Sequence, residues 1–438
     1  MNYWSFLKRL NRNASTKYLL TCGSGLLAFV ALGEKTRKKT DFDIAVENAT
    51  DLVQRIKDES GCPGIVAAVG IDGQLVWSQG FGYANIEHRI ECTPKTVMRI
   101  ASISKSFTMA LVGKLHEDGL LDYDQFIEKY VKTWPEKYFN GKPAKITIRQ
   151  LLSHFGGIRH YLKCNQKSST PVENELLIPE YYNKKRYKTI SEALSIFKDD
   201  ELCSLPGTEF LYTTYGWTLI SAVLESVSSK SFEVMIKNLF QTLDLKNTYL
   251  DENDTIIYHR ASNYVREAKT GKLKNAEYVD NSYKWGGGGL LSTAPDLVKF
   301  GLSMLSSYQT NSPNNFLTRK TMIEMWQGVP NAKCIWEKDG SYGMGWCIHS
   351  KYISHTGGSI GSSSVLLIVP KENSEEKLHG VSVAIMCNMQ GVSLYKTAKE
   401  IAQNFQDLKV DEIIVDKQKV KDQDDLHDIL LHTPRHDD

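Results

Sequence analysis

Cysteine pairs at metal-binding or redox spacing are absent from this chain of 438 residues. Its eight cysteines lie far apart, and none forms the C-x-x-C motif of a zinc knuckle or a thioredoxin-type site. We therefore expect buried free thiols. Five residues separate His154 from His160, which fits neither the H-x-x-x-H face of a helix nor a zinc finger. The sequence predicts no metal site and no cofactor.

A basic stripe with interleaved aromatic residues is also missing. The formal net charge is +2, but residues 1–40 contain eight of the 53 basic residues and only one of the 51 acidic residues. The rest of the chain has 45 basic and 50 acidic residues, a net charge of −5. Nucleic acid is therefore not expected as a partner.

The apolar run near the N-terminus is shorter than the roughly 20 residues that a membrane-spanning helix needs. A basic region without acids comes first, and an apolar stretch, Tyr18–Gly33, follows it. This composition is typical of a mitochondrial presequence with a sorting or anchoring segment. We expect residues 1–40 to be a mitochondrial leader, cleaved or marginally anchored in a membrane. A secretory signal-anchor is the alternative, although its basic region would be atypically long.

Periodicity and turn signals place strands at both ends of the chain. Asp72-Gly73 is a hairpin signal between two expected strands, and apolar residues spaced by four after Ala101 predict a helix that ends at Gly119. The expected strands are 64–71, 74–80, 363–369 and 380–388, and the other expected helices are 43–56 and 394–408. The predicted class is α+β, a sandwich with an inserted helical lobe at about 120–300. A charged tail, 409–438, follows.

Ser102 and Lys105 form the candidate catalytic pair. A serine hydroxyl is a weak nucleophile until a base takes its proton, and the segment Ser102-Ile103-Ser104-Lys105 places an amine at i+3 on the same helical face. Other S-x-x-K segments occur in this chain, so the place of Ser102 relative to the expected helix distinguishes it from them. Ser102 opens an apolar-faced helix whose dipole can stabilise an oxyanion, and burial would lower the pKa of the lysine. The alternative is an ordinary N-cap serine.

Two further segments can supply the rest of an active site. Tyr212 follows the turn at Pro206-Gly207 and can relay protons, although a buried tyrosine is more often part of a core. The segment His355-Thr356-Gly357-Gly358 precedes an expected strand, and its glycines let a substrate backbone lie close to a sheet edge. An ordinary turn is the alternative for this segment.

In this order the three segments resemble the motifs of the penicillin-binding-protein and serine β-lactamase family. The resemblance points to the class C β-lactamase and D-alanyl-D-alanine carboxypeptidase branch, and to an animal mitochondrial branch. It covers about residues 43–408 and also rests on the segments Arg99–Lys105, Leu151–Tyr161, Trp285–Asp296 and Ser341–Trp346. It implies a β-lactamase/transpeptidase-like fold with an antiparallel sheet. It also implies the intermembrane space as the compartment and filaments as a form of self-assembly.

Carried over residue by residue, the resemblance implies that Ser102 is the acylated nucleophile. Lys105 and Tyr212 would share the general-base and general-acid work. The backbone N–H groups of Ser102 and Gly358 would form the oxyanion hole, worth on the order of 3 kcal/mol for each donor.

Two departures from the family pattern concern substrate binding. Thr214 stands where the family has an asparagine that grips a substrate carbonyl. His355-Thr356-Gly357 replaces Lys-Thr-Gly, which exchanges a permanent cation for one only partly charged near neutral pH. A β-lactam anchored by its carboxylate should therefore bind poorly.

Two functions remain open at this stage. The first is a peptidase, amidase or esterase that acts on a peptide or small acyl substrate through an acyl-enzyme. The second is a structural protein, catalytically weak or inactive, that self-assembles and organises the intermembrane space or the inner membrane. The retained Ser102 and Lys105 favour the enzyme, and the two departures keep the structural alternative open.

Overall fold

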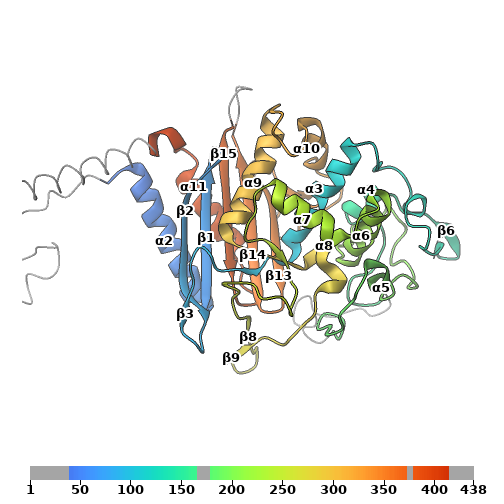
Figure 1. The fold of residues 1–438 in the computed structure, drawn as a ribbon, viewed down its shortest axis with the longest axis horizontal. Coiled ribbons are helices and arrows are strands. Elements are labelled where there is room, and N and C mark those ends of the chain that lie inside the picture. The colour runs from blue at the N-terminus through green and yellow to red at the C-terminus, as the bar shows by residue number, and fades with distance from the viewer. Residues whose placement is uncertain (1–38, 165–177, 372–377, 414–438) are drawn as a thin grey trace, which may run out of the picture.

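The computed structural model describes residues 39–164, 178–371 and 378–413 (Figure 1). Nearly all of the predicted leader, 1–40, and most of the predicted tail, 409–438, lie outside these described residues. Within the described ranges, no helix has both the length and the apolar character that crossing a bilayer requires.

An antiparallel sheet of eight strands forms the centre, and both ends of the chain supply its strands. The strand order is β11-β12-β13-β14-β15-β1-β2-β3. The strands are β1 (Gly64–Ile71), β2 (Gln74–Asn85), β3 (Ile90–Glu91), β11 (Ser341–Tyr342), β12 (Cys347–Ile348), β13 (Ile353–Ser359), β14 (Ser362–Pro370) and β15 (Gly380–Cys387). The predicted antiparallel sheet is confirmed, with β1 paired directly with β15.

The hairpin between β1 and β2 forms at the predicted turn. Asp72 and Gly73 both have positive φ, at 48° and 88°, as a two-residue turn between twisted strands requires. β1 has the predicted bounds, whereas β2 continues five residues beyond the expected Gly80.

Helices cover both faces of the sheet (Figure 1). Successive side chains of a strand point to opposite faces. Ile65, Ala67 and Val69 accordingly pack in one apolar cluster with α2 (Asp41–Ser60) and α11 (Tyr395–Phe405). Val66 and Ala68 belong to a second cluster that includes α9 (Ala294–Gln309). Burial on both faces explains why β1 is apolar along its whole length.

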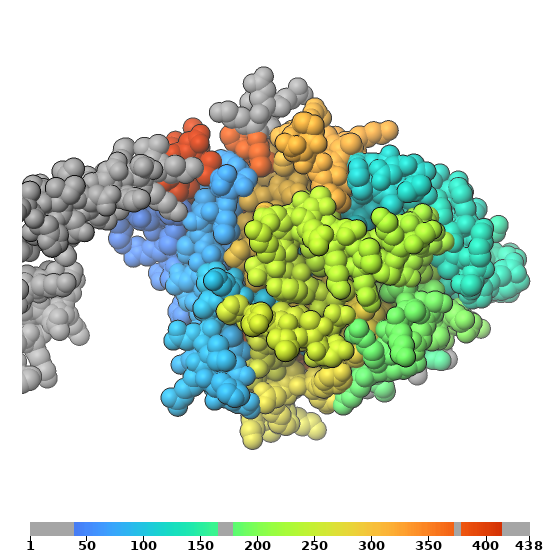
Figure 2. Space-filling view, in the orientation of Figure 1, coloured from blue at the N-terminus to red at the C-terminus, as the bar shows by residue number. Residues whose placement is uncertain are grey.

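The other elements lie beside the sheet, and most of them belong to the helical lobe. Figure 2 shows its cyan, green and yellow-green segments next to the blue strands. Short strands join its helices, which we had not expected. The helices are α3 (Ser104–Glu117), α4 (Ile148–Leu152), α5 (Ile190–Leu194), α6 (Tyr215–Ser228), α7 (Phe232–Thr242), α8 (Trp285–Gly288) and α10 (Arg319–Met325), with 3-10 turns η1 (Ala101–Ile103), η2 (Ile127–Lys129) and η4 (Ser282–Lys284). The strands are β4 (Met98–Arg99), β5 (Lys137–Phe139), β6 (Lys142–Ala144), β7 (Tyr249–Leu250), β8 (Tyr264–Arg266), β9 (Leu273–Asn275) and β10 (Leu290–Ser292).

The expectation of free thiols throughout is wrong for four cysteines. Cys164 is bonded to Cys203 and Cys334 to Cys347, with Cα–Cα distances of 5.1 and 5.8 Å. Tertiary folding brings residues 39 and 13 positions apart into disulfide range, which spacing along the chain does not reveal. The free thiols in the described part of the chain, Cys62, Cys92 and Cys387, are buried as expected.

Candidate active site

Ser102 lies in the 3-10 turn η1, immediately before α3 and not in its first turn. Ala101, the residue before it, has a φ of 49°, which is uncommon for a residue with a Cβ. Such strained backbone is concentrated at functional sites. The Ser104 hydroxyl donates to the Ala101 carbonyl at 2.7 Å and stabilises this turn.

The backbone ahead of Ser102 is tied to both halves of the fold. Ser364 of β14 donates from its hydroxyl to the Ile100 carbonyl at 2.9 Å, and the Ile100 N–H donates to Leu290 of β10 at 3.0 Å. Buried Arg99 forms an ion pair of 2.8 Å with Asp251. Contacts from both the sheet and the helical lobe therefore fix the backbone that precedes Ser102.

Lys105 brings its amine to the Ser102 hydroxyl, as the S-x-x-K spacing predicts. Its Nζ lies 2.9 Å from Ser102 Oγ and donates to the Gly287 carbonyl at 2.5 Å. The side chain is completely buried. Burial, and then the charge of Lys284, hold the pKa of Lys105 well below its usual range. A neutral amine has the lone pair that can accept the serine proton.

The glycine run in α8 makes the Lys105 contact geometrically possible. A Cβ on Gly287 would lie 2.8 Å from Thr214 Cγ2 and 2.9 Å from the Thr214 carbonyl oxygen. Only glycine therefore lets α8 pack this closely on the start of α6. The resulting position directs the Gly287 carbonyl to Lys105.

Tyr212 lies beside this pair, with its ring centroid 4.9 Å from Lys105 Nζ. The buried ring of His154 packs 4.3 Å from the Tyr212 ring. The Thr213 N–H donates to His154 Nδ1 at 3.1 Å, so that nitrogen carries no proton. Burial lowers the pKa of His154 well below its usual range. His154, for which the sequence predicted no role at the site, thus holds the tyrosine segment in place.

A cavity of about 510 Å³ opens onto Ser102. Five of the eight predicted site residues line it: Ser102, Tyr212, Thr214, Thr356 and Gly358. The other lining residues are Ala101, His160, Tyr161, Tyr181, Leu211, Lys284, Gly287, Gly288, Ile335, Trp336 and Ser359. Lys105 is not part of the lining and joins the site through its contact with Ser102.

His355 is completely buried and does not line this cavity. Its Nδ1 lies 2.6 Å from the Thr356 carbonyl, which can only accept, so Nδ1 carries the proton. Its Nε2 then accepts from the Tyr342 hydroxyl at 3.0 Å. Burial lowers the pKa of His355 to about 3. The expected partial charge near neutral pH is therefore wrong, because both ring nitrogens are satisfied in a dry environment.

The two glycines of β13 serve different needs. A Cβ on Gly357 would lie 2.2 Å from the Ile100 carbonyl oxygen, so this glycine lets β13 press against the backbone ahead of Ser102. Gly358 is exposed at the cavity, and a Cβ there would meet nothing within 4 Å. The strand edge at Gly358 therefore leaves room for a substrate backbone.

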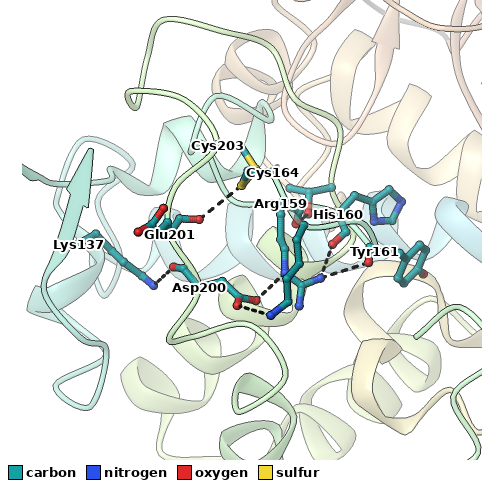
Figure 3. Close-up of a disulfide and its surroundings, with 10 residues drawn as sticks. Lys137, Arg159, His160, Tyr161, Cys164, Asp200, Glu201 and Cys203 are labelled. Atoms are coloured by element: carbon teal, nitrogen blue, oxygen red, sulfur yellow. Dashed lines mark hydrogen bonds and ion pairs between the residues drawn. A yellow bond between two sulfur atoms is a disulfide. The ribbon is translucent and has the colours of Figure 1, made fainter. Parts of the chain in front are cut away.

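A buried arginine, Arg159, supports two residues of the cavity lining, His160 and Tyr161 (Figure 3). Arg159 pairs with Glu180 at 2.8 Å and Asp200 at 2.5 Å, and donates to the His160 carbonyl at 2.8 Å. The Cys164–Cys203 disulfide joins the segment just after Tyr161 to the segment just after Asp200. This network holds His160 and its neighbour Tyr161 at the cavity.

Lys284 is a second lysine at the cavity, and sequence reasoning missed it. It is 5% exposed and ends the turn η4, next to the glycine run of α8. Its Nζ donates to the Tyr161 hydroxyl at 3.1 Å. The one signal in the sequence was its position beside Trp285–Asp296, a segment that carries part of the family resemblance, but no spacing rule connects Lys284 with Ser102.

A serine in contact with a buried lysine, between an antiparallel sheet and a helical lobe, defines the serine β-lactamase and penicillin-binding-protein class. Residues 49–404 match the family described as Beta-lactamase. The chain belongs to this family of serine hydrolases, and the predicted resemblance and fold are confirmed.

Relatives identify the branch within the family. The chain is 40% identical to the mitochondrial serine beta-lactamase-like protein LACTB of Mus musculus, over 83% of this chain and 81% of that protein. Identity to the Homo sapiens protein of the same name is 39%, over 83% and 80%.

Solved structures agree with the fold. An octameric penicillin-binding protein homologue from Pyrococcus abyssi is 26% identical with a TM-score of 0.65, over 81% of this chain and 75% of that chain. A class C beta-lactamase is 16% identical with a TM-score of 0.64, over 85% and 99%. The latter likeness concerns the fold alone.

Proposed function

We propose that this protein is a peptidase or amidase that forms an acyl-enzyme on Ser102. The observation that carries the proposal is the 2.9 Å contact between Ser102 Oγ and the amine of a completely buried lysine. Because burial disfavours the ammonium form and lowers the pKa of Lys105, this amine is suited to accept the serine proton. Ester hydrolysis follows the same steps and is the alternative for the substrate bond.

The proposed reaction has two halves. Lys105 takes the Ser102 proton while Oγ bonds to the substrate carbonyl carbon, and the backbone N–H groups of Ser102 and Gly358 receive the oxyanion. Tyr212 passes the proton to the leaving amine as the carbon–nitrogen bond breaks. Water then attacks the acyl-enzyme, its proton returns through the same groups, and Ser102 is released. Thr214 and Thr356 at the cavity would orient the substrate.

We also propose that the protein works in mitochondria, in the intermembrane space, as a single catalytic domain at about 43–408 with a lobe at about 120–300. The names of the mouse and human relatives and the composition of residues 1–40 support mitochondria, and the family resemblance is the argument for the intermembrane space. A fusion of residues 1–45 to a reporter should enter mitochondria, and a cytosolic reporter would contradict this. Association with the inner membrane through the leader remains part of the proposal.

Labelling with a fluorophosphonate probe, located by mass spectrometry, tests the enzymatic proposal. Wild type should carry the probe on Ser102, and Ser102→Ala should carry none. Lys105→Ala and Tyr212→Phe should label about 10²–10⁴-fold more slowly, the usual contribution of a general acid or base. Ser195→Ala is a matched control, because Ser195 and Lys198 form another S-x-x-K segment at a partly exposed helix end. A probe on a different residue, or no labelling of the folded protein, would remove the proposal.

Self-assembly is proposed separately from catalysis. The homologue from Pyrococcus abyssi is octameric, which supports self-assembly, and the family resemblance suggests filaments. Light scattering after size exclusion should give a mass above one chain. Assembled protein without labelling at Ser102 would instead favour the structural alternative.

A further inference from the structure

Lys284 differs from Arg99 and Arg159 in having no counter-charge among the described residues, and from Lys137 in having a single hydrogen-bond acceptor there. Arg99 pairs with Asp251, and Arg159 pairs with two carboxylates. Buried Lys137 donates to two backbone carbonyls. For Lys284, no described carboxylate forms an ion pair, and the Tyr161 hydroxyl at 3.1 Å is the acceptor that the described residues supply.

Lys284 nevertheless sits where a cation is tolerated. Its Nζ lies 5.4 Å from the ring centroids of Tyr161 and Tyr181 and 5.2 Å from that of Tyr283. Aromatic faces attract a cation without neutralising it. An ammonium has three N–H donors, and Tyr161 accepts from one. The remaining donors are available on a side chain that lines the cavity of Ser102.

The positive charge that the sequence led us to expect at His355 is absent. His355 is neutral, both of its ring nitrogens have partners, and it does not line the cavity. Lys105 serves the serine and the Gly287 carbonyl. An anionic group of the substrate would therefore find its positive partner at Lys284, beside Tyr161 and Tyr181, and not at β13.

We propose that Lys284 is a specificity-determining residue that binds a carboxylate of the substrate against Tyr161 and Tyr181. The inference rests on the proposed hydrolysis at Ser102 and names its substrate class, peptides or acyl compounds that carry a carboxylate near the cleaved bond. The carboxylate comes from an acidic side chain or from a chain terminus. Charge-assisted hydrogen bonds in a desolvated site favour such a substrate over its neutral isostere.

The test compares isosteric substrates on the full-length protein. One pair of chromogenic peptides differs by Asp or Asn next to the cleaved bond, and a second pair by a free or amidated C-terminus. In wild type, at least one pair should show about tenfold higher kcat/KM for the carboxylate, and which pair does so identifies its source. Lys284→Met should reduce that ratio to near one, and Lys284→Arg should retain much of it. Lys396→Met, whose side chain is 86% exposed, is the control and should leave the ratio unchanged.

Ser102 labelling by an uncharged probe is followed in parallel, so that the two proposals fail in different ways. Wild type that is labelled but shows ratios near one in both pairs would overturn the role of Lys284 and leave the hydrolase intact. An unchanged ratio in Lys284→Met would overturn it as well. Loss of labelling in wild type would instead remove the hydrolase. If Lys284→Met fails to fold, the ratios measured on wild type and on Lys284→Arg still test the role of Lys284.

Discussion

The buried amine of Lys105 predicts a pH dependence of stability that is separate from catalysis. In the unfolded chain this lysine has an ordinary pKa of about 10.4. In the folded protein, burial and the charge of Lys284 hold its pKa well below that value. Between the two values the unfolded state binds the extra proton, so the free energy of unfolding rises with pH. Each pH unit in this window contributes about 1.4 kcal/mol.

Replacing Lys105 with methionine removes this titration and preserves the length of the side chain. Urea denaturation of wild type and Lys105→Met at pH 7.5 and 9.5 measures the effect. We expect wild type to gain up to about 3 kcal/mol relative to the variant over these two pH units. The slope is the informative quantity, because the lost contacts with Ser102 and the Gly287 carbonyl change the difference by the same amount at both pH values.

Lys396→Met is the control for this experiment, because that side chain is exposed and its curve should run parallel to wild type. A parallel curve for Lys105→Met would refute the reasoning. It would mean that Lys105 carries the same proton folded and unfolded, and a lysine that stays protonated cannot accept the proton of Ser102.

Three other predictions follow from particular contacts. Gly287→Ala should destabilise the protein by about 1–3 kcal/mol, measured by urea denaturation, and slow Ser102 labelling, because the added Cβ would press on Thr214. His355, whose folded pKa is about 3, should make wild type lose stability as pH falls from about 6.5 toward 3, and His355→Gln should weaken that dependence. Cys203→Ser, which removes the disulfide to Cys164, should lower the free energy of unfolding by about 2–4 kcal/mol. Reductant should cause no additional loss through this bond in the variant.

The sequence predicted those parts of the molecule that depend on local chain geometry. β1 has its expected bounds because an apolar run meets a two-residue turn with the required positive φ. Ser102 and Lys105 meet because residues three apart share one face of a helical turn. In both cases the interaction lies within a few residues of the chain.

The parts that the sequence did not predict depend on contacts between distant segments. Lys284 reaches the site through the packing of α8 on α3, and His154 through the contact of its ring with Tyr212. One signal was available but unused. If residues 353–359 are taken as a strand, alternation puts His355 and Gly357 on one face and Thr356 and Gly358 on the other, which is the division that the structure shows.

The two lysines of the cavity are coupled, because the charge of one helps to keep the other neutral. Burial is the larger cause of the lowered pKa of Lys105, and the positive charge of Lys284 is the second cause. Lys284→Met should therefore raise the pKa of Lys105. Acylation of Ser102 needs the neutral amine, so its rate rises with pH through that pKa. For an uncharged probe, the acid limb of the rate should move to higher pH in Lys284→Met and stay in place in Lys396→Met. An acid limb that does not move would show that burial alone sets the base, and that Lys284 acts on the substrate without acting on Lys105.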